Sequence, residues 1–161
     1  PMICEKIIGK LDSQKVSGKK VEYVDIDWDD AFKKIHKKTT DAGTELGIRM
    51  DDSVLTRGLQ EGDILFEDAD RVIAVRIPPC EVIRVRVAPD HGFMTAKVCY
   101  EIGNRHAPLF YGKDAYSFIT PYNEPMLQML SKLHGVTAER AREKLDFDRR
   151  ISSGAPGHHH H

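Results

Sequence analysis

The chain has 161 residues, of which 40% are hydrophobic and 30% are charged, a composition typical of a globular protein with one or two small domains. Its 24 lysine and arginine residues nearly cancel its 25 aspartate and glutamate residues, so we expect neither nucleic acid nor a membrane surface as a partner. No run reaches the roughly 20 apolar residues that cross a bilayer, and the N-terminus lacks the apolar stretch of a signal peptide. Three widely spaced cysteines, Cys4, Cys80 and Cys99, form no CxxC pair and favour a reducing, cytoplasmic location.

The first half of the chain is predicted to form an all-β domain. Short segments rich in β-branched residues are separated by turn-forming residues, as expected for a small sandwich or barrel. The expected strands are residues 3–11, 21–26, 45–50, 63–67 and 71–77. Residues 29–38 fit two alternatives, because Phe32 and Ile35 have helical spacing while the stretch also alternates as a strand does.

Two consecutive prolines, Pro78 and Pro79, interrupt the β-rich pattern. Neither can donate a hydrogen bond to a sheet, and both hold the backbone extended. We therefore place a domain boundary here and expect domains over residues 1–76 and 77–148. Residues 149–161 have the polar, glycine- and proline-containing composition of a disordered, His-containing tail.

The second domain is predicted to alternate strands with helices. Its helices are indicated by apolar residues repeated at steps of three and four, and its strands by alternation of apolar and polar residues. In chain order we expect a strand at residues 81–87, a helix from 94 to Gly103, a hairpin of residues 108–111 and 115–119, and a helix from 126 to Gly135.

Local and global patterns disagree over residues 136–147. Their composition, rich in alanine, glutamate and arginine, favours a helix. The preceding elements follow the order βαββα, which lacks only its closing strand. We predict a strand here, so that the domain has a βαββαβ order and the whole chain belongs to the α+β class.

No motif for phosphate binding or nucleophilic catalysis occurs in the sequence. The Gly-Lys pairs lack the other residues of a P-loop, and GxSxG, HExxH and GxGxxG are absent. Four aspartates around Trp28 lack the glycine and the closing glutamate of a calcium loop, so we interpret them as a solvated acidic edge. They are Asp25, Asp27, Asp29 and Asp30.

His106 is the best isolated candidate for a metal ligand. It follows the predicted end of a helix, where the backbone turns and the imidazole is exposed, and a neutral imidazole binds borderline metals. Arg105 beside it disfavours a cation, and the alternative is an ordinary surface histidine. One His106 is a weak site alone, but a symmetric dimer brings two copies together.

The remaining single histidines and the sulfur residues are interpreted as structural. His36 lies among lysines and is expected to be exposed, His91 begins the first helix, and His134 lies near the end of the second. Cys99 and two methionines at helical spacing are interpreted as packing residues. The methionines are Met126 and Met129.

Four histidines close the chain as His158, His159, His160 and His161. Four imidazoles on a flexible segment bind nickel, copper, zinc or cobalt. The residues alone leave two alternatives open, a native metal-binding tail and a purification tag.

The sequence resembles the family of the urease accessory protein UreE over nearly its whole length. The strongest marker is GNRH at residues 103–106, preceded by AKVCY and followed two residues later by Pro108 and Leu109. The first half adds KKTTDAGTELGIR at residues 37–49 and GDIL at residues 62–65.

The resemblance implies a β-rich partner- or peptide-binding domain followed by a ferredoxin-like metal-binding and dimerisation domain. It implies a cytoplasmic homodimer with no catalysis of its own, which delivers Ni²⁺ to apo-urease together with an accessory GTPase. Nickel would lie at the dimer interface between the two copies of His106, assisted by the tail histidines, with Zn²⁺ or Cu²⁺ as alternatives in vitro. The family tail is often histidine-rich, which favours a native tail. Residues 119–123 lack the additional histidines of some relatives, so no further interior site is expected.

Two rival functions remain open from the sequence. The first is an adaptor that binds a partner through its β-rich half and whose histidines are incidental. The second is a metal-dependent hydrolase, which needs further ligands around His106 that the sequence does not nominate.

Overall fold

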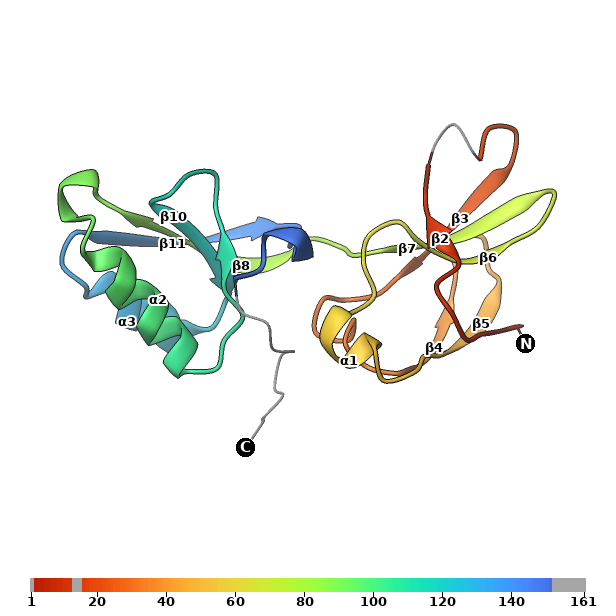
Figure 1. Cartoon of the computed structure of the whole chain (residues 1–161), viewed down its shortest axis with the longest axis horizontal. Coiled ribbons are helices and arrows are strands. Elements are labelled where there is room, and N and C mark those ends of the chain that lie inside the picture. The colour runs from red at the N-terminus through yellow and green to blue at the C-terminus, as the bar shows by residue number, and fades with distance from the viewer. Residues whose placement is uncertain (1, 13–15, 152–161) are drawn as a thin grey trace. The chain divides into compact units, whose positions relative to one another are not determined.

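The computed structural model describes residues 2–12 and 16–151, which divide into two compact units between Pro78 and Pro79. The division lies at the proline pair, two residues beyond the domain end expected at residue 76. Figure 1 shows strands in both units and the two longer helices in the second, which confirms the α+β class. No helix in the described ranges is long and apolar enough to cross a membrane.

The first unit consists of two sheets and one short helix. One sheet has the strand order β1-β5-β4, with β1 (Met2–Cys4) parallel to β5 (Glu45–Arg49) and β4 (Ile35–Thr39) antiparallel to it. The other has the order β2-β6-β7-β3 and comprises β2 (Gly9–Lys10), β6 (Asp63–Glu67), β7 (Arg71–Arg76) and β3 (Lys20–Asp25). The unit also contains a single helical turn, α1 (Val54–Arg57), beside its two sheets.

Two predicted segments of this unit differ in detail from the structure. The single strand expected over residues 3–11 is two short strands, β1 and β2, separated by residues without regular structure. In the ambiguous segment 29–38, turns are followed by strand β4, because pairing with β5 outweighs the weak helical spacing of Phe32 and Ile35.

Buried carboxylates in the first unit are satisfied by specific partners. Glu22 is 2% exposed and accepts hydrogen bonds of 2.7 Å from the hydroxyls of both Thr40 and Thr44 and one of 3.1 Å from Arg71. Asp63 is fully buried and forms a two-point ion pair with Arg57. A buried charge is tolerated only with such partners, so these groups specify how the strands pack.

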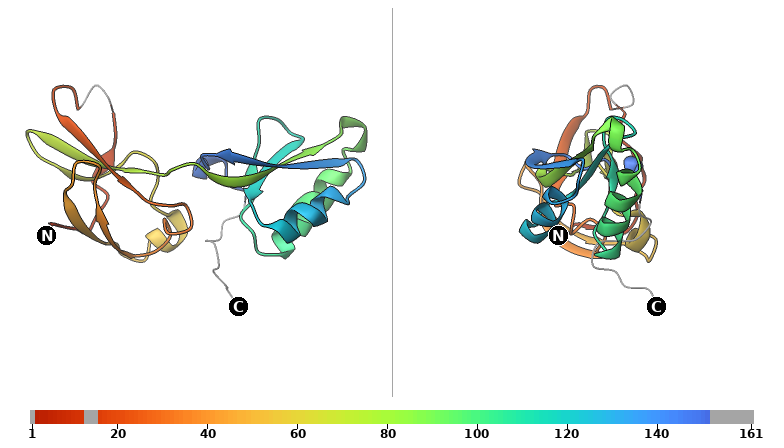
Figure 2. Two further views of the ribbon diagram at one scale, coloured as in Figure 1. Left: turned by 180° about the vertical axis from the view of Figure 1, so that it is seen from behind. Right: turned by 90° about the vertical axis from the view of Figure 1, so that its left-hand side faces the viewer.

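The second unit is a ferredoxin-like βαββαβ fold, as predicted. Its sheet has the order β11-β8-β10-β9, and all neighbouring strands are antiparallel. Helices α2 and α3 pack together beside the sheet (Figure 2). The elements are β8 (Cys80–Val87), α2 (Met94–Asn104), β9 (Phe110–Tyr111), β10 (Ser117–Pro121), α3 (Glu124–Ser131) and β11 (Val136–Glu143), with single 3₁₀ turns η1 (Pro89–His91) and η2 (Phe147–Arg149).

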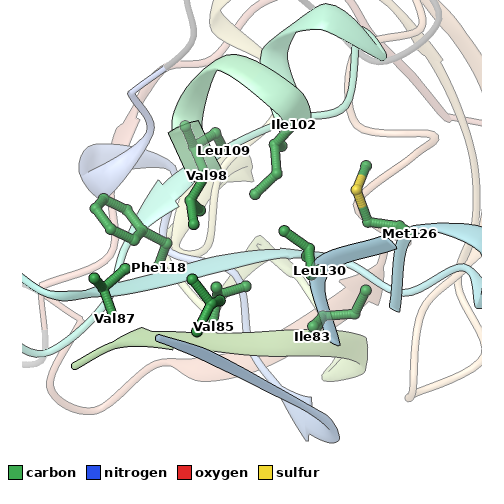
Figure 3. Close-up of a cluster of buried hydrophobic side chains, with 10 residues drawn as sticks. Ile83, Val85, Val87, Val98, Ile102, Leu109, Phe118, Met126 and Leu130 are labelled. Carbon is green, nitrogen blue, oxygen red and sulfur yellow. The ribbon is translucent and has the colours of Figure 1, made fainter. Parts of the chain in front are cut away.

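The core of the second unit explains its helix and strand patterns. Ile83, Val85 and Val87 project from β8 toward Val98 and Ile102 of α2, while Arg84 and Arg86 between them are exposed (Figure 3). Helix α3 is capped by Asn123, whose side chain accepts a 2.8 Å hydrogen bond from the backbone N–H of Met126. It ends at Ser131, four residues before the predicted stop at Gly135.

Strand β11 confirms the predicted strand over residues 136–143, whereas residues 144–146 have no regular structure and residue 147 begins η2. Eight residue pairs join β11 to β8, from Val136 opposite Val87 to Glu143 opposite Cys80. Arg84 of β8 forms ion pairs with Glu139 and Glu143 across this register. The ladder and these cross-strand pairs outweigh the helical propensity of the segment.

Candidate metal centre

His106 follows helix α2 in a backbone conformation that is rare for a residue with a Cβ. Its φ is 59°, and no other non-glycine residue of ranges 2–12 and 16–151 has a positive φ. The backbone N–H of His106 donates to the carbonyl of Gly103 over 2.9 Å, and that of Ala107 to the carbonyl of Ile102 over 3.3 Å. These two bonds form a Schellman motif, in which glycine usually occupies the left-handed position.

The motif corrects the predicted end of this helix at Gly103. Gly103 lies inside α2, which continues to Asn104, and the left-handed turn comes at His106 instead. A residue with a Cβ costs roughly 1 kcal/mol more than glycine in this conformation. An exposed histidine stands where glycine would have a lower conformational energy. A backbone outlier of this kind indicates a functional site.

The charge of Arg105 is balanced within the same helix. Its guanidinium lies 2.6 Å from Glu101, which also pairs with Lys97 at 3.2 Å. The hydrogen bond from Arg105 lowers the pKa of Glu101, so this carboxylate stays ionised. The repulsion of a metal cation that Arg105 introduces is therefore reduced.

A line of apolar and small side chains on the exposed face of α2 leads to His106. We call this line the α2 stripe; its members follow one another at helical steps of three or four and are Phe93, Ala96, Tyr100 and Gly103. Phe93 and Tyr100 are 73% and 64% exposed. A Cβ added at Gly103 would meet no atom within 4 Å, so this end of the stripe is open to a close neighbour.

His36 is buried, which contradicts its expected exposure. It lies on β4 with 7% of its surface exposed, and its Nε2 donates to the carbonyl of Lys33 over 2.9 Å. Burial lowers the pKa of His36, so the ring is neutral and its Nε2 is occupied. The prediction inferred exposure from the neighbouring lysine residues. Alternate residues of a strand face opposite sides of the sheet, so these neighbours do not report the burial of His36.

His91 and His134, both interpreted as structural, lie together. Their ring centres are 4.7 Å apart and their planes are inclined by 68°. Sequence periodicity misses this pair because the residues come from separate loops. The predicted βαββαβ order could have indicated this pairing, because it places the loop after β8 and the loop before β11 at one end of the sheet.

The sulfur residues do not add to a metal centre in the described part of the chain. All three cysteines are free, with Cys4 buried and Cys80 and Cys99 partly buried. Burial raises the pKa of Cys4 and Cys99, which keeps these thiols protonated and poor as ligands. Cys99 and Met129 pack against the core of the second unit, and Met126 belongs to it.

Three of the four aspartates that we interpreted as a solvated acidic edge lie close together. Carboxylates of Asp27, Asp29 and Asp30 lie within 4.8 Å of one another, whereas Asp25 pairs with Arg76 at 2.7 Å. Asp30 also pairs with Lys33 at 2.7 Å, and Asp27 and Asp29 are exposed. The arrangement agrees with a solvated edge.

A second exposed apolar feature lies on the β1-β5-β4 sheet of the first unit. Ile3 and Ile35 are 52% and 73% exposed and line one shallow groove, in which the Ile3 side chain lies over Gly47. We call these three residues the β-sheet patch.

The tail histidines His158, His159, His160 and His161 lie outside the described residues.

Comparison with known proteins places both units in one family. The model for the N-terminal domain of the UreE urease accessory protein matches residues 4–78, and that for its C-terminal domain matches residues 80–161. The chain belongs to the UreE family. UreE of Helicobacter pylori strain G27 is 39% identical over 155 residues, which cover 96% of this chain and 89% of that protein. The Helicobacter pylori strain Shi470 protein is 40% identical with the same coverage, and the Helicobacter bizzozeronii protein is 38% identical over 96% of this chain and 85% of its own length.

Membership in this UreE family confirms the resemblance drawn from the GNRH segment. It also agrees with the expectation that the chain is an accessory protein and not an enzyme, since the relatives are named urease accessory proteins.

Proposed function

We propose that this member of the UreE family is a cytoplasmic homodimeric nickel metallochaperone, which carries Ni²⁺ to apo-urease during maturation of the urease active site. The observation that carries the proposal is His106, an exposed imidazole held in a left-handed Schellman position at the end of the α2 stripe. The family membership of the chain supplies the link to urease.

The α2 stripe supports dimerisation near His106. If two α2 helices packed antiparallel along their full length, the two copies of His106 would lie at opposite ends, roughly 16 Å apart for 11 residues. A two-fold axis close to Gly103 instead brings both imidazoles together, and the missing side chain of Gly103 allows the helices to approach closely. We therefore place the symmetry axis at the Gly103 end of the stripe.

The chemistry of such a centre suits transport. Two neutral imidazoles bind Ni²⁺ and leave coordination positions for water or for the tail residues His158–His161. An incomplete ligand set exchanges its metal faster than a closed four-ligand cage, so the ion can be captured and released. The same ligands bind Zn²⁺ or Cu²⁺ in vitro.

Partners follow from the role of the family. We propose that the dimer works with apo-urease and an accessory GTPase of the maturation complex. The alternative function is an adaptor in that complex without a metal role. The β-sheet patch favours this alternative, because an exposed groove of Ile3, Ile35 and Gly47 suits an apolar segment of a partner protein.

A Ni²⁺ titration followed by both calorimetry and sedimentation tests the proposal. We compare the wild-type chain, His106→Ala, and a variant with His158–His161 all changed to alanine. The proposal expects one tight Ni²⁺ per dimer, lost in His106→Ala and kept at lower affinity in the tail variant. Tight binding that survives His106→Ala, or a monomer at every Ni²⁺ concentration, would overturn it and favour the adaptor.

A further inference from the structure

Two histidines and a carboxylate lie near one another at the opposite end of α2 from His106. The loop after β8 and the loop before β11 lie side by side at one end of the second unit (Figure 1), and they do so from behind as well (Figure 2). His91 belongs to the first loop and His134 to the second. Helix α2 begins at Met94 and ends at Asn104, so His106 is separated from this cluster by the helix length.

The two loops are held in register by the sheet. The backbone N–H of Ala88 donates to the carbonyl of Gly135 over 2.8 Å, one step beyond the Val87–Val136 pair of the ladder. The His91 ring lies directly over Gly135, where any Cβ would collide with it. The sheet therefore fixes the relative position of the two loops that carry His91 and His134 before any ligand arrives.

The spacing of the rings fits two ligands of one ion. A metal about 2.1 Å from a ring nitrogen lies roughly 3.2 Å from the ring centre, so two such rings at roughly 90–110° have centres about 4.5–5.2 Å apart. The observed separation is 4.7 Å. His134 is exposed, and rotation about its χ2 angle can turn either ring nitrogen toward His91.

Asp90 supplies the supporting carboxylate. Its Oδ1 lies 3.0 Å from Nδ1 of His91, the contact that metal-binding histidines commonly make with their second nitrogen. When Nδ1 donates to Asp90, the lone pair is on Nε2, which is then the ligand atom.

We propose that His91 and His134 form a binding site for one divalent transition-metal ion per protomer, with Asp90 as the positioning residue. Imidazole pairs favour ions such as Ni²⁺, Cu²⁺ and Zn²⁺ over Mg²⁺ or Ca²⁺, and water completes the coordination. The site uses no residue of the proposed His106 centre, so each proposal can fail without the other.

The test removes the other accessible histidines and titrates Ni²⁺ alone. The background protein is the full chain with His106 and His158–His161 changed to alanine, which leaves buried His36 as the only other imidazole. We expect one Ni²⁺ per chain by calorimetry. Adding His134→Ala weakens binding by more than about tenfold, and adding Asp90→Asn weakens it about tenfold.

Ser131→Ala is the matched control, because exposed Ser131 lies three residues before His134, donates its hydroxyl to the carbonyl of Leu127 over 2.7 Å and offers no imidazole. It should leave the affinity unchanged. In proton NMR spectra, substoichiometric Ni²⁺ should broaden the ring signals of His91 and His134 and spare those of His36. His134 is exposed, so its variant remains folded and the result can be interpreted. Absence of binding in the background protein, or equal affinity in His134→Ala, would overturn the proposal.

Discussion

The backbone N–H of His106 donates a 2.9 Å hydrogen bond to the carbonyl of Gly103, and this bond closes helix α2 with a left-handed histidine. The two residues have separate tasks. His106 presents an imidazole at the cost of backbone strain, and Gly103 leaves space beside it. Substitutions at these positions therefore separate the proposed metal binding and the proposed dimerisation from folding.

Replacing His106 should affect stability and nickel binding in different ways. His106→Gly relieves the strain of the left-handed position, so we expect it to be more stable than His106→Ala by up to about 1 kcal/mol. Both variants should lose the tight Ni²⁺ site. Urea unfolding of the two variants and the wild type measures the stability difference. A strongly destabilised His106→Gly would show that the imidazole is needed for folding.

Gly103→Ala should stabilise the protomer while weakening the dimer. Alanine raises helix stability by up to about 1 kcal/mol where there is room for its methyl group, and Gly103 has such room. At the proposed two-fold axis, however, the added methyl groups separate the helices. Sedimentation equilibrium with Ni²⁺ gives the dimer affinity, and thermal unfolding of dilute protein gives the protomer stability. If Gly103→Ala leaves the dimer affinity unchanged, the two-fold axis lies elsewhere.

His36 should make the first unit less stable as the solution is acidified. Burial lowers the pKa of His36 in the folded state, so the unfolded chain binds the proton more readily. The stabilisation is present above the unfolded pKa of about 6.5 and is lost as pH falls from there through the lowered folded pKa. His36→Gln cannot titrate. Its melting temperature should fall less than that of the wild type between pH 7 and pH 5, and parallel pH profiles would contradict this expectation.

Glu22 should contribute a second loss of stability at lower pH. Hydrogen bonds from Thr40 and Thr44 lower the pKa of this buried carboxyl. Its stabilisation is therefore present above the unfolded pKa of about 4.3 and is lost as pH falls through the lowered folded pKa.

The variant Glu22→Gln isolates this contribution. At pH 7 we expect it to cost about 1–3 kcal/mol, because Arg71 loses its buried anionic partner. The difference from wild type should begin to shrink below the unfolded pKa of about 4.3 and should be lost as the pH falls through the lowered folded pKa of Glu22. Chemical unfolding at several pH values measures it. The exposed ion-paired Glu139 offers the control Glu139→Gln, which should have little effect.

Residue spacing by itself determined much of the local structure. The alternation of residues 81–87 identified β8, the apolar steps in α2 placed Val98 and Ile102 in the core, and Pro78 and Pro79 lie at the division between the units. The exposed turn at His106 was also predictable, since a helix end leaves backbone groups to be satisfied by a tight turn. These features depend on neighbours within a few positions, which sequence periodicity reports directly.

Tertiary structure decided the features that join distant segments. Residues 136–143 have helical composition but form a strand, because β8 offers eight backbone partners. His36 is buried because its position on β4 faces inward, despite the lysines around it. The pairing of His91 with His134 exists only after the sheet brings two loops to the same end. Burial and long-range contacts are properties of the folded chain, and their energies exceed local propensities of a few tenths of a kcal/mol per residue.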